Sequence, residues 1–238
     1  MSAPVLSVHD LHVSYNGSHV VSGYCADLAA GTLTVMLGRN GAGKTSTLRG
    51  IVGFLAHEAG TARGTIKIDG TRVRHPSPYR LSRAGVGLVA ERDKIFANLT
   101  VREQLRLVTT SRRDTGEVLE FFPRLAERAG VRAGLLSGGE RQMLATALVL
   151  LRKPRVLLVD ELSLGLAPAV VAELMHYLRR LADEQNLTIL AADQAVHASL
   201  GVADNVQVMD SGSLVASGPI TEIKVDAVLE AYLGSDER

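Results

Sequence analysis

Apolar residues along the chain follow two spacings, one typical of strands and one typical of helices. Alternating apolar and polar positions near the start predict antiparallel strands, and short continuous apolar runs further on predict buried strands of a parallel sheet. The turn signals Asp69-Gly70 and Asp210-Ser211-Gly212 each predict a hairpin between flanking apolar runs. The predicted strands lie at 5–15, 20–28, 32–37, 65–68, 71–74, 85–89, 156–159 and 188–192, with the second hairpin at 206–215.

A helical period replaces these patterns in the middle of the chain. From residue 100 to residue 128 the apolar spacing is helical, with Val101, Leu105 and Val108 on one side. Alternating strands and helices predict an α/β fold with a parallel-sheet core, and the early hairpins add an antiparallel β layer. Further helices are predicted after the glycine-rich run at 38–43, at 138–152, at 168–183, and near the C-terminus through Tyr232.

The length of 238 residues suits one large domain, 1–238, with an inserted part. Because the middle of the chain carries helical patterns alone, residues 97–152 are predicted to form a helical subdomain. The α/β core with its antiparallel layer then consists of residues 1–96 and 153–238.

Composition and charge exclude several classes of protein. Lysine and arginine number 26 against 25 aspartates and glutamates, and a formal charge of +1 argues against a protein that coats nucleic acid. The single cysteine, Cys25, excludes an intrachain disulfide framework. The sequence has neither a secretory leader pattern at its start nor an apolar run long enough to span a membrane. We therefore expect a cytosolic protein, or a peripheral one that reaches a membrane through a partner.

Residues 38–45 fit the phosphate-loop (P-loop) pattern G-x-x-x-x-G-K-[ST] and lie between a predicted strand and a predicted helix. In such a loop, backbone N–H groups close around phosphate oxygens, and the helix N-terminus adds a partial positive charge. Lys44 is expected to reach the β- and γ-phosphates of a nucleotide, and the Thr45 hydroxyl to bind Mg²⁺. The predicted nucleotide-binding residues of this loop are Gly38, Arg39, Asn40, Gly41, Ala42, Gly43, Lys44, Thr45 and Ser46.

Two carboxylates follow the apolar run at 156–159, and together with the phosphate loop they indicate a site that hydrolyses a bound phosphate ester. Ligands of open α/β sheets bind at the carboxyl ends of the strands, which is where Asp160 and Glu161 are predicted to lie. Asp160 is placed to hold Mg²⁺ through water. Glu161 is placed to polarise the attacking water as a general base.

The run LSGGERQ at 136–142 resembles the signature of ATP-binding-cassette (ABC) ATPases, and the resemblance extends from Tyr15 to the C-terminus. It implies an ABC cassette fold in which Tyr15 stacks on the adenine of ATP. It also implies a head-to-tail dimer that encloses two ATP molecules, so the signature binds the γ-phosphate of ATP held by the other subunit. The signature residues assigned to this role are Ser137, Gly138, Gly139 and Glu140.

Several positions depart from the usual residues of that family. Glu91 stands where the family has a glutamine that binds Mg²⁺, and its carboxylate is a hard oxygen ligand as well. Leu162 replaces a proline, and Ala167 replaces an aspartate. Gln194 replaces the switch histidine, and its amide can hydrogen-bond a γ-phosphate without carrying a positive charge.

These departures resemble the second ATPase of branched-chain amino acid importers, as do the runs FPRL at 122–125, SLGLAP at 163–168 and AYLG at 231–234. A urea or short-chain amide importer has much the same pattern. The resemblance implies ATP and Mg²⁺ as ligands and a peripheral position on the cytoplasmic face of a bacterial membrane. The implied partners are permease subunits, a solute-binding protein that acts indirectly, and a second ABC ATPase or another copy of this chain, with no nucleic acid.

Unequal nucleotide sites are one hypothesis that follows from the resemblance. The site built on Lys44 and Glu161 would hydrolyse ATP slowly because its switch residue is Gln194, whereas the site that receives Ser137 would be faster. The alternative is that Gln194 replaces histidine without effect. Other functions left open are a soluble ABC ATPase acting on DNA or ribosomes, a module that binds ATP without useful hydrolysis, and an exporter or lipid-transport ATPase.

Overall fold

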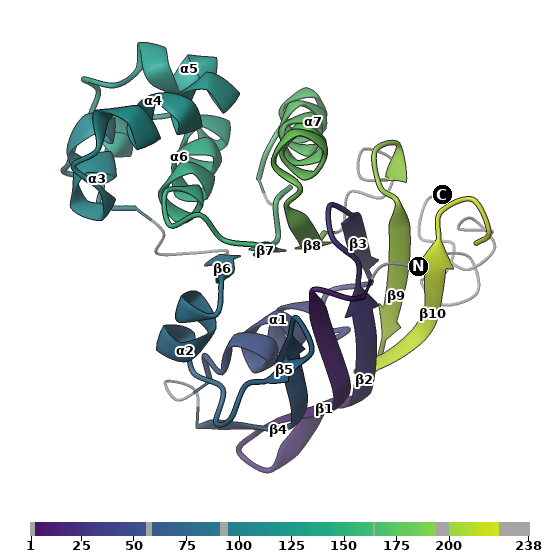
Figure 1. The fold of residues 1–238 in the computed structure, drawn as a ribbon. Coiled ribbons are helices and arrows are strands. Elements are labelled where there is room, and N and C mark those ends of the chain that lie inside the picture. The colour runs from purple at the N-terminus through teal and green to yellow at the C-terminus, as the bar shows by residue number, and fades with distance from the viewer. Residues whose placement is uncertain (1–2, 56–58, 91–94, 164, 194–199, 224–238) are drawn as a thin grey trace.

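The computed structural model describes residues 3–55, 59–90, 95–163, 165–193 and 200–223, which form two β-sheets and a set of helices (Figure 1). The antiparallel sheet has the strand order β2-β1-β4-β5, and the larger mixed sheet has the order β10-β9-β3-β8-β7-β6. The predicted α/β fold with a parallel core and an antiparallel layer is therefore confirmed. Glu91, Gln194 and the predicted C-terminal helix through Tyr232 lie outside the described residues.

The smaller sheet consists of β1 (Leu6–Tyr15), β2 (Ser18–Leu28), β4 (Gly60–Ile68) and β5 (Thr71–Arg72). Asp69 and Gly70 have φ values of 45° and 73°, which is the backbone of the tight hairpin turn that the sequence predicts. β4 begins five residues earlier than predicted, at Gly60. Its first half has few apolar residues and is held by pairing with β1, so the apolar pattern did not indicate it.

The larger sheet contains five parallel strands, β9 (Asn205–Asp210), β3 (Leu33–Leu37), β8 (Thr188–Ala192), β7 (Val156–Asp160) and β6 (Val86–Val89). β10 (Ser213–Pro219) pairs antiparallel with β9. Every residue of β3, β7 and β8 is buried, as expected for strands covered on both faces. The carboxyl ends of these three neighbouring strands meet at one end of the sheet, where ligands bind in such folds.

Two apolar cores cover the two faces of the larger sheet. One face packs on α1 (Lys44–Val52) and on the smaller sheet, and its core includes Met36, Leu158 and Leu190. The opposite face packs on α6 (Gly138–Leu150) and α7 (Pro168–Gln185), with Val35 and Val159 in the core (Figure 1). The two faces alternate along each strand because successive side chains point to opposite sides.

The stretch 100–128, where the spacing predicts helix, forms three helices: α3 (Val101–Val108), α4 (Arg112–Phe121) and α5 (Pro123–Glu127). Ser111 interrupts the helix because its side chain caps α4 by accepting the N–H of Asp114. Pro123 has no N–H to donate and begins α5. A short 3₁₀ turn, η2 (Ala133–Leu135), precedes α6.

One helix was not predicted, α2 (Pro78–Arg83). Its six residues are too few to show an apolar period, although Ser77 and Pro78 are an N-terminal signal. Ser77 caps the helix by accepting the N–H of Arg80 at 3.4 Å.

Candidate functional site

The phosphate loop lies between β3 and α1, in the strand–loop–helix context that the sequence predicts. Gly41 and Gly43 have φ values of 82° and 100°, a region that glycine occupies without strain. At Gly38 a Cβ atom would lie 2.5 Å from the carbonyl oxygen of Met209, so no side chain fits. The loop is therefore a tight backbone cradle at the N-terminus of α1, which suits a bound phosphate group.

Lys44 is buried in this cradle, and its Nζ donates to the carbonyl oxygens of Gly38 at 2.6 Å and Arg39 at 3.1 Å. Burial lowers the pKa of Lys44, while the negative charges of Glu161, Asp160 and Asp193 act in the opposite direction. A nearby anion stabilises a buried ammonium group that is held by carbonyl oxygens. The surroundings of Lys44 thus fit a phosphate group at the centre of the loop.

Thr45 and Asp160 join the phosphate loop to the carboxyl end of β7. The Thr45 hydroxyl donates to Oδ1 of the buried Asp160 at 2.8 Å. Both are hard oxygen ligands of the type that Mg²⁺ prefers, and this ion usually keeps several waters and binds phosphate oxygens as well. Within the ranges that the structure describes, no group of three or more His, Cys, Asp or Glu side chains could hold a metal. The donor set therefore fits Mg²⁺ bound jointly with a nucleotide.

Glu161 follows β7 directly and has an unusual backbone. Its φ is 46°, a left-handed conformation that costs a residue with a side chain roughly 1–2 kcal/mol. Its N–H donates to the carbonyl oxygen of Ala192 at 3.0 Å, which ties the position to the end of β8. Strained residues of this kind cluster at functional sites, and this one places a partly exposed carboxylate beside the phosphate loop.

The signature residues open α6, where Ser137 is the N-cap. Ser137 and Glu140 form a reciprocal capping box: the Ser137 side chain accepts the Glu140 N–H at 3.3 Å, and Glu140 accepts the Ser137 N–H at 2.8 Å. Burial raises the pKa of Glu140, but hydrogen bonds from Ser137 and Arg128 outweigh burial, so the net pKa is lowered. The box orders the helix start that is predicted to face a second nucleotide.

Gly138 and Gly139 allow this helix start to pack against the segment that leads into α7. A Cβ at Gly138 would lie 2.6 Å from Cδ2 of Leu166. A Cβ at Gly139 would overlap Cγ1 of Val170. Packing within the chain is therefore a second reason for these glycines, besides the predicted binding of phosphate.

The structure brings the phosphate loop, Asp160 and Glu161 together. The signature begins α6, a helix that contacts other elements than α1 does. α1 contacts β1, β2, β4, β7 and β8, whereas α6 contacts α3, α4, α5, α7 and β6. Arg39, Asn40 and Gly41 are exposed at the tip of the loop, Ala42 is buried, and Ser46 is partly exposed in the first turn of α1. The roles of Glu91 and Gln194 stay predictions.

Tyr15 ends β1, opposite Gly60 on β4, and its ring lies against that glycine. Its hydroxyl is buried and has no hydrogen-bond partner among the described residues. The stacking of Tyr15 on adenine stays a prediction.

Sequence reasoning missed Asp193 and Ser163. Asp193 follows β8, is completely buried, and accepts a hydrogen bond from the Ser163 hydroxyl. The available signal was an aspartate directly after the apolar run at 189–192, similar to the signal that identified Asp160.

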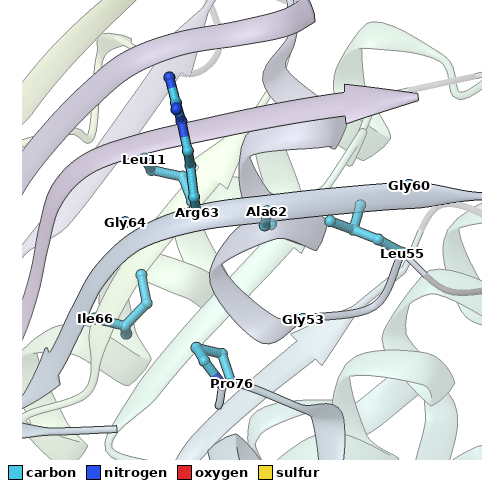
Figure 2. Close-up of a pocket in the computed structure, with 10 residues that line it drawn as sticks. Leu11, Gly53, Leu55, Gly60, Ala62, Arg63, Gly64, Ile66 and Pro76 are labelled. Atoms are coloured by element: carbon cyan, nitrogen blue, oxygen red, sulfur yellow. The ribbon is translucent and has the colours of Figure 1, made fainter. Parts of the chain in front are cut away.

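A cavity of about 230 Å³ lies elsewhere, beneath β4 at the end of α1 distant from Lys44 (Figure 2). None of the described residues that line it was predicted to bind nucleotide. Its lining residues are Leu11, Gly50, Gly53, Leu55, Gly60, Ala62, Arg63, Gly64, Ile66 and Pro76. The cavity is therefore separate from the predicted nucleotide-binding loop.

Comparisons with known proteins identify the family of the chain. Residues 22–163 match the family model described as ABC transporter. The chain is 32% identical over 219 residues to the probable branched-chain amino acid transport ATP-binding protein LivF of Archaeoglobus fulgidus, covering 90% of this chain and 91% of that one. It is 31% identical over 245 residues to the lipopolysaccharide export system ATP-binding protein LptB of Escherichia coli K12, covering 98% of each.

A solved structure shows the same fold. The ADP conformation of MJ1267, an ATP-binding cassette of an ABC transporter, superposes with a TM-score of 0.84 at 21% identity, covering 98% of this chain and 100% of that one. No helix of the described residues is both long and apolar enough to cross a membrane. The family match and these relatives show that the chain, with its phosphate loop and paired carboxylates, belongs to the ABC transporter family. It is an ATP-binding subunit that hydrolyses ATP.

Proposed function

We propose that Lys44, Thr45, Asp160 and Glu161 bind and hydrolyse ATP with Mg²⁺ at the carboxyl end of the larger sheet. The observation that carries this proposal is the Thr45–Asp160 hydrogen bond, which unites the phosphate loop with the carboxylates. When bound, Mg²⁺ neutralises charge on the phosphate oxygens. Lys44 and the loop N–H groups bind the phosphates and orient the γ-phosphate.

Glu161 supplies the general base in this proposal. Its carboxylate takes a proton from the attacking water, whose oxygen bonds to the γ-phosphorus as the bond to the β–γ bridging oxygen breaks, and the proton then passes to the released phosphate. The products are ADP and inorganic phosphate. The hydrogen bond from the Glu161 N–H to the Ala192 carbonyl oxygen supports this role because it holds the Glu161 backbone in place at the end of β7.

The signature on α6 is proposed to complete a nucleotide site on a second cassette. Ser137 and the N–H groups of Gly138 and Gly139 lie at a capped helix N-terminus, a natural binding position for a γ-phosphate. The second cassette is either a related ATPase or another copy of this chain. In the proposed assembly both cassettes sit on permease subunits at the cytoplasmic face of a bacterial membrane.

The transported solute is proposed to be a branched-chain amino acid. The similarity to LivF supports this, together with the residue pattern of that importer branch in the sequence. The nearly equal similarity to LptB favours one competing function, energising lipopolysaccharide export. An importer of urea or short amides is the third option.

The test begins with the purified chain. Phosphate release and affinity for a fluorescent ATP analogue are measured for the wild type, Lys44→Ala and Glu161→Gln. We expect Lys44→Ala to lose affinity and Glu161→Gln to keep affinity while phosphate release falls about 100-fold or more. Normal hydrolysis by both variants would refute the proposed site.

The solute is tested in the native cells with Lys44→Ala placed in the chromosomal gene. Gly116→Ala, an exposed change in α4 with open space around it, is the matched control. We expect uptake of labelled leucine to fall while uptake of labelled urea and lipopolysaccharide export stay normal. Permease subunits and a second ABC ATPase should co-purify with the chain in mild detergent. Loss of urea uptake or of export instead would reassign the solute.

A further inference from the structure

The first half of β4 lies at an edge of the smaller sheet. β5 pairs with β4 only at Lys67 and Ile68, and one further hydrogen bond joins the Val73 N–H to the Ile66 carbonyl oxygen at 2.9 Å. Within the residues that the structure describes, no strand pairs with this side of β4 before Ile66. Residues 61–64 are exposed, so this edge is accessible to another extended chain.

Two residues present their backbone groups along this edge. The backbone hydrogen-bonding groups of successive strand residues point alternately to the two sides of the strand. Because the Ile66 carbonyl faces β5, the backbone groups of Gly64 and Ala62 face the same side. The Gly60 N–H, which also faces that side, donates to the Leu55 carbonyl oxygen at 3.1 Å and closes the far end. Gly64 and Ala62 therefore offer donors and acceptors between two paired ends.

The cavity of about 230 Å³ beneath β4 lies along this edge (Figure 2). Side chains alternate between the two faces of a strand, and Figure 2 shows the Arg63 side chain pointing away from Pro76. A strand added beside β4 would place alternate side chains next to Ala62 and Gly64, in the cavity, and the others on the face of Arg63. The small size of Ala62 and Gly64 leaves room for a larger side chain. The apolar side chains around that room are Leu11, Leu55, Ile66 and Pro76.

The charge around this edge favours an acidic partner. Residues 60–85 carry six lysines and arginines and one carboxylate, Asp69, a local charge of +5, whereas the whole chain carries +1. Asp69 already forms an ion pair with Arg155. Within the described part of the chain, Arg63, Arg72 and Arg74 form no ion pair with a carboxylate. Carboxylates on a partner would therefore meet unpaired positive charge here.

We propose that the edge of β4 binds an extended acidic segment of a partner protein, which adds antiparallel to β4 in line with β5. Apolar side chains of the segment enter the cavity, and acidic side chains on the other face lie beside Arg63. Backbone hydrogen bonds to Ala62 and Gly64 supply affinity, and the alternate side chains supply specificity. The inference is independent of the proposed nucleotide site, because none of these three residues was predicted to bind nucleotide.

The test uses an end-blocked, fluorescein-labelled peptide of the sequence Asp-Leu-Asp-Leu-Asp, whose binding to the full chain is followed by fluorescence anisotropy. Two further versions carry backbone N-methyl groups, one on the leucines and one on the aspartates, and Lys-Leu-Lys-Leu-Lys is the basic control. The wild type is compared with Arg63→Glu, with Ala62→Phe, which fills the cavity, and with Thr61→Phe, the matched change on the opposite face. Affinity for a fluorescent ATP analogue shows that each variant is folded.

We expect the wild type and Thr61→Phe to bind the acidic peptide alike, and Ala62→Phe and Arg63→Glu each to weaken binding about tenfold or more. In an antiparallel pair, the peptide residues opposite Ala62 and Gly64 both enter the cavity and exchange hydrogen bonds with β4. N-methylation of the leucines should therefore abolish binding, whereas N-methylation of the aspartates should change the affinity less than about threefold. The basic peptide should bind at least about tenfold more weakly.

Several results would overturn the inference. The first is no binding of the acidic peptide to the wild type at about 1 mM. Equal binding of the basic peptide, or binding that survives leucine methylation and Ala62→Phe but not Arg63→Glu, would indicate charge attraction without strand pairing. Binding of phosphatidylglycerol vesicles in place of the peptide would assign the basic surface to a membrane. Because the methylated peptides test pairing on the wild type, the outcome does not depend on the folding of any variant.

Discussion

Gly139→Ala tests whether the signature glycine is required for packing within the chain. In a helix interior, alanine is favoured over glycine by about 1 kcal/mol, so the change would stabilise an open helix. At Gly139, however, the new Cβ overlaps Cγ1 of Val170, whose branched side chain has few rotamers to move to. Overpacking of this kind costs about 1–3 kcal/mol. We therefore expect a net destabilisation of up to about 2 kcal/mol.

A double-mutant cycle isolates this overlap. Val170→Ala removes the obstructing methyl group, so the double variant should recover about 1–3 kcal/mol relative to the sum of the single changes. Gly116→Ala is the control, because nothing lies within 4 Å of its Cβ position in α4, and it should stabilise by about 0.5–1 kcal/mol. Alanine keeps the backbone N–H at 139, so a hydrogen bond from that group to phosphate is not removed.

The assay is urea or thermal unfolding followed by far-UV circular dichroism, since the chain has no tryptophan. For a chain of this length, Gly139→Ala should lower Tm by up to about 8 °C. If Gly139→Ala is as stable as Gly116→Ala, or if Val170→Ala restores nothing, the packing argument is wrong and phosphate binding alone accounts for the glycine.

Three further outcomes follow from the site and the fold. Thr45→Ala should weaken Mg²⁺-dependent binding of ATP about tenfold or more while leaving binding without Mg²⁺ nearly unchanged, and equal losses in both conditions would contradict a Mg²⁺ role. In the assembled transporter, replacing Ser137 should reduce turnover more than replacing Glu161, and equal losses would remove the hypothesis of unequal sites. Gly53→Ala should destabilise by about 2–5 kcal/mol in urea unfolding, because its φ is 69° and its Cβ would overlap backbone before α2. Gly17→Ala, at φ 82° in open space, should cost only about 1–2 kcal/mol, and equal costs would refute the overlap.

The sequence by itself determined those features that depend on contiguous residues. The phosphate loop, the signature run and the turn at Asp69-Gly70 each lie within one short stretch, so residue type and spacing were enough to predict them. Fully apolar runs predicted the buried strands, since a strand covered on both faces has no polar side. The end of such a strand also predicted where Asp160 and Glu161 would lie.

Only the tertiary structure decided the features that join distant parts of the chain. The hydrogen bonds from Thr45 to Asp160 and from Ser163 to Asp193 each span a long stretch of sequence. The overlap of Gly139 with Val170 depends on how α6 and the start of α7 approach one another. Local patterns carry no information about such approaches, because side chains far apart in the sequence are brought together by the order of the strands and the packing of helices on the sheet.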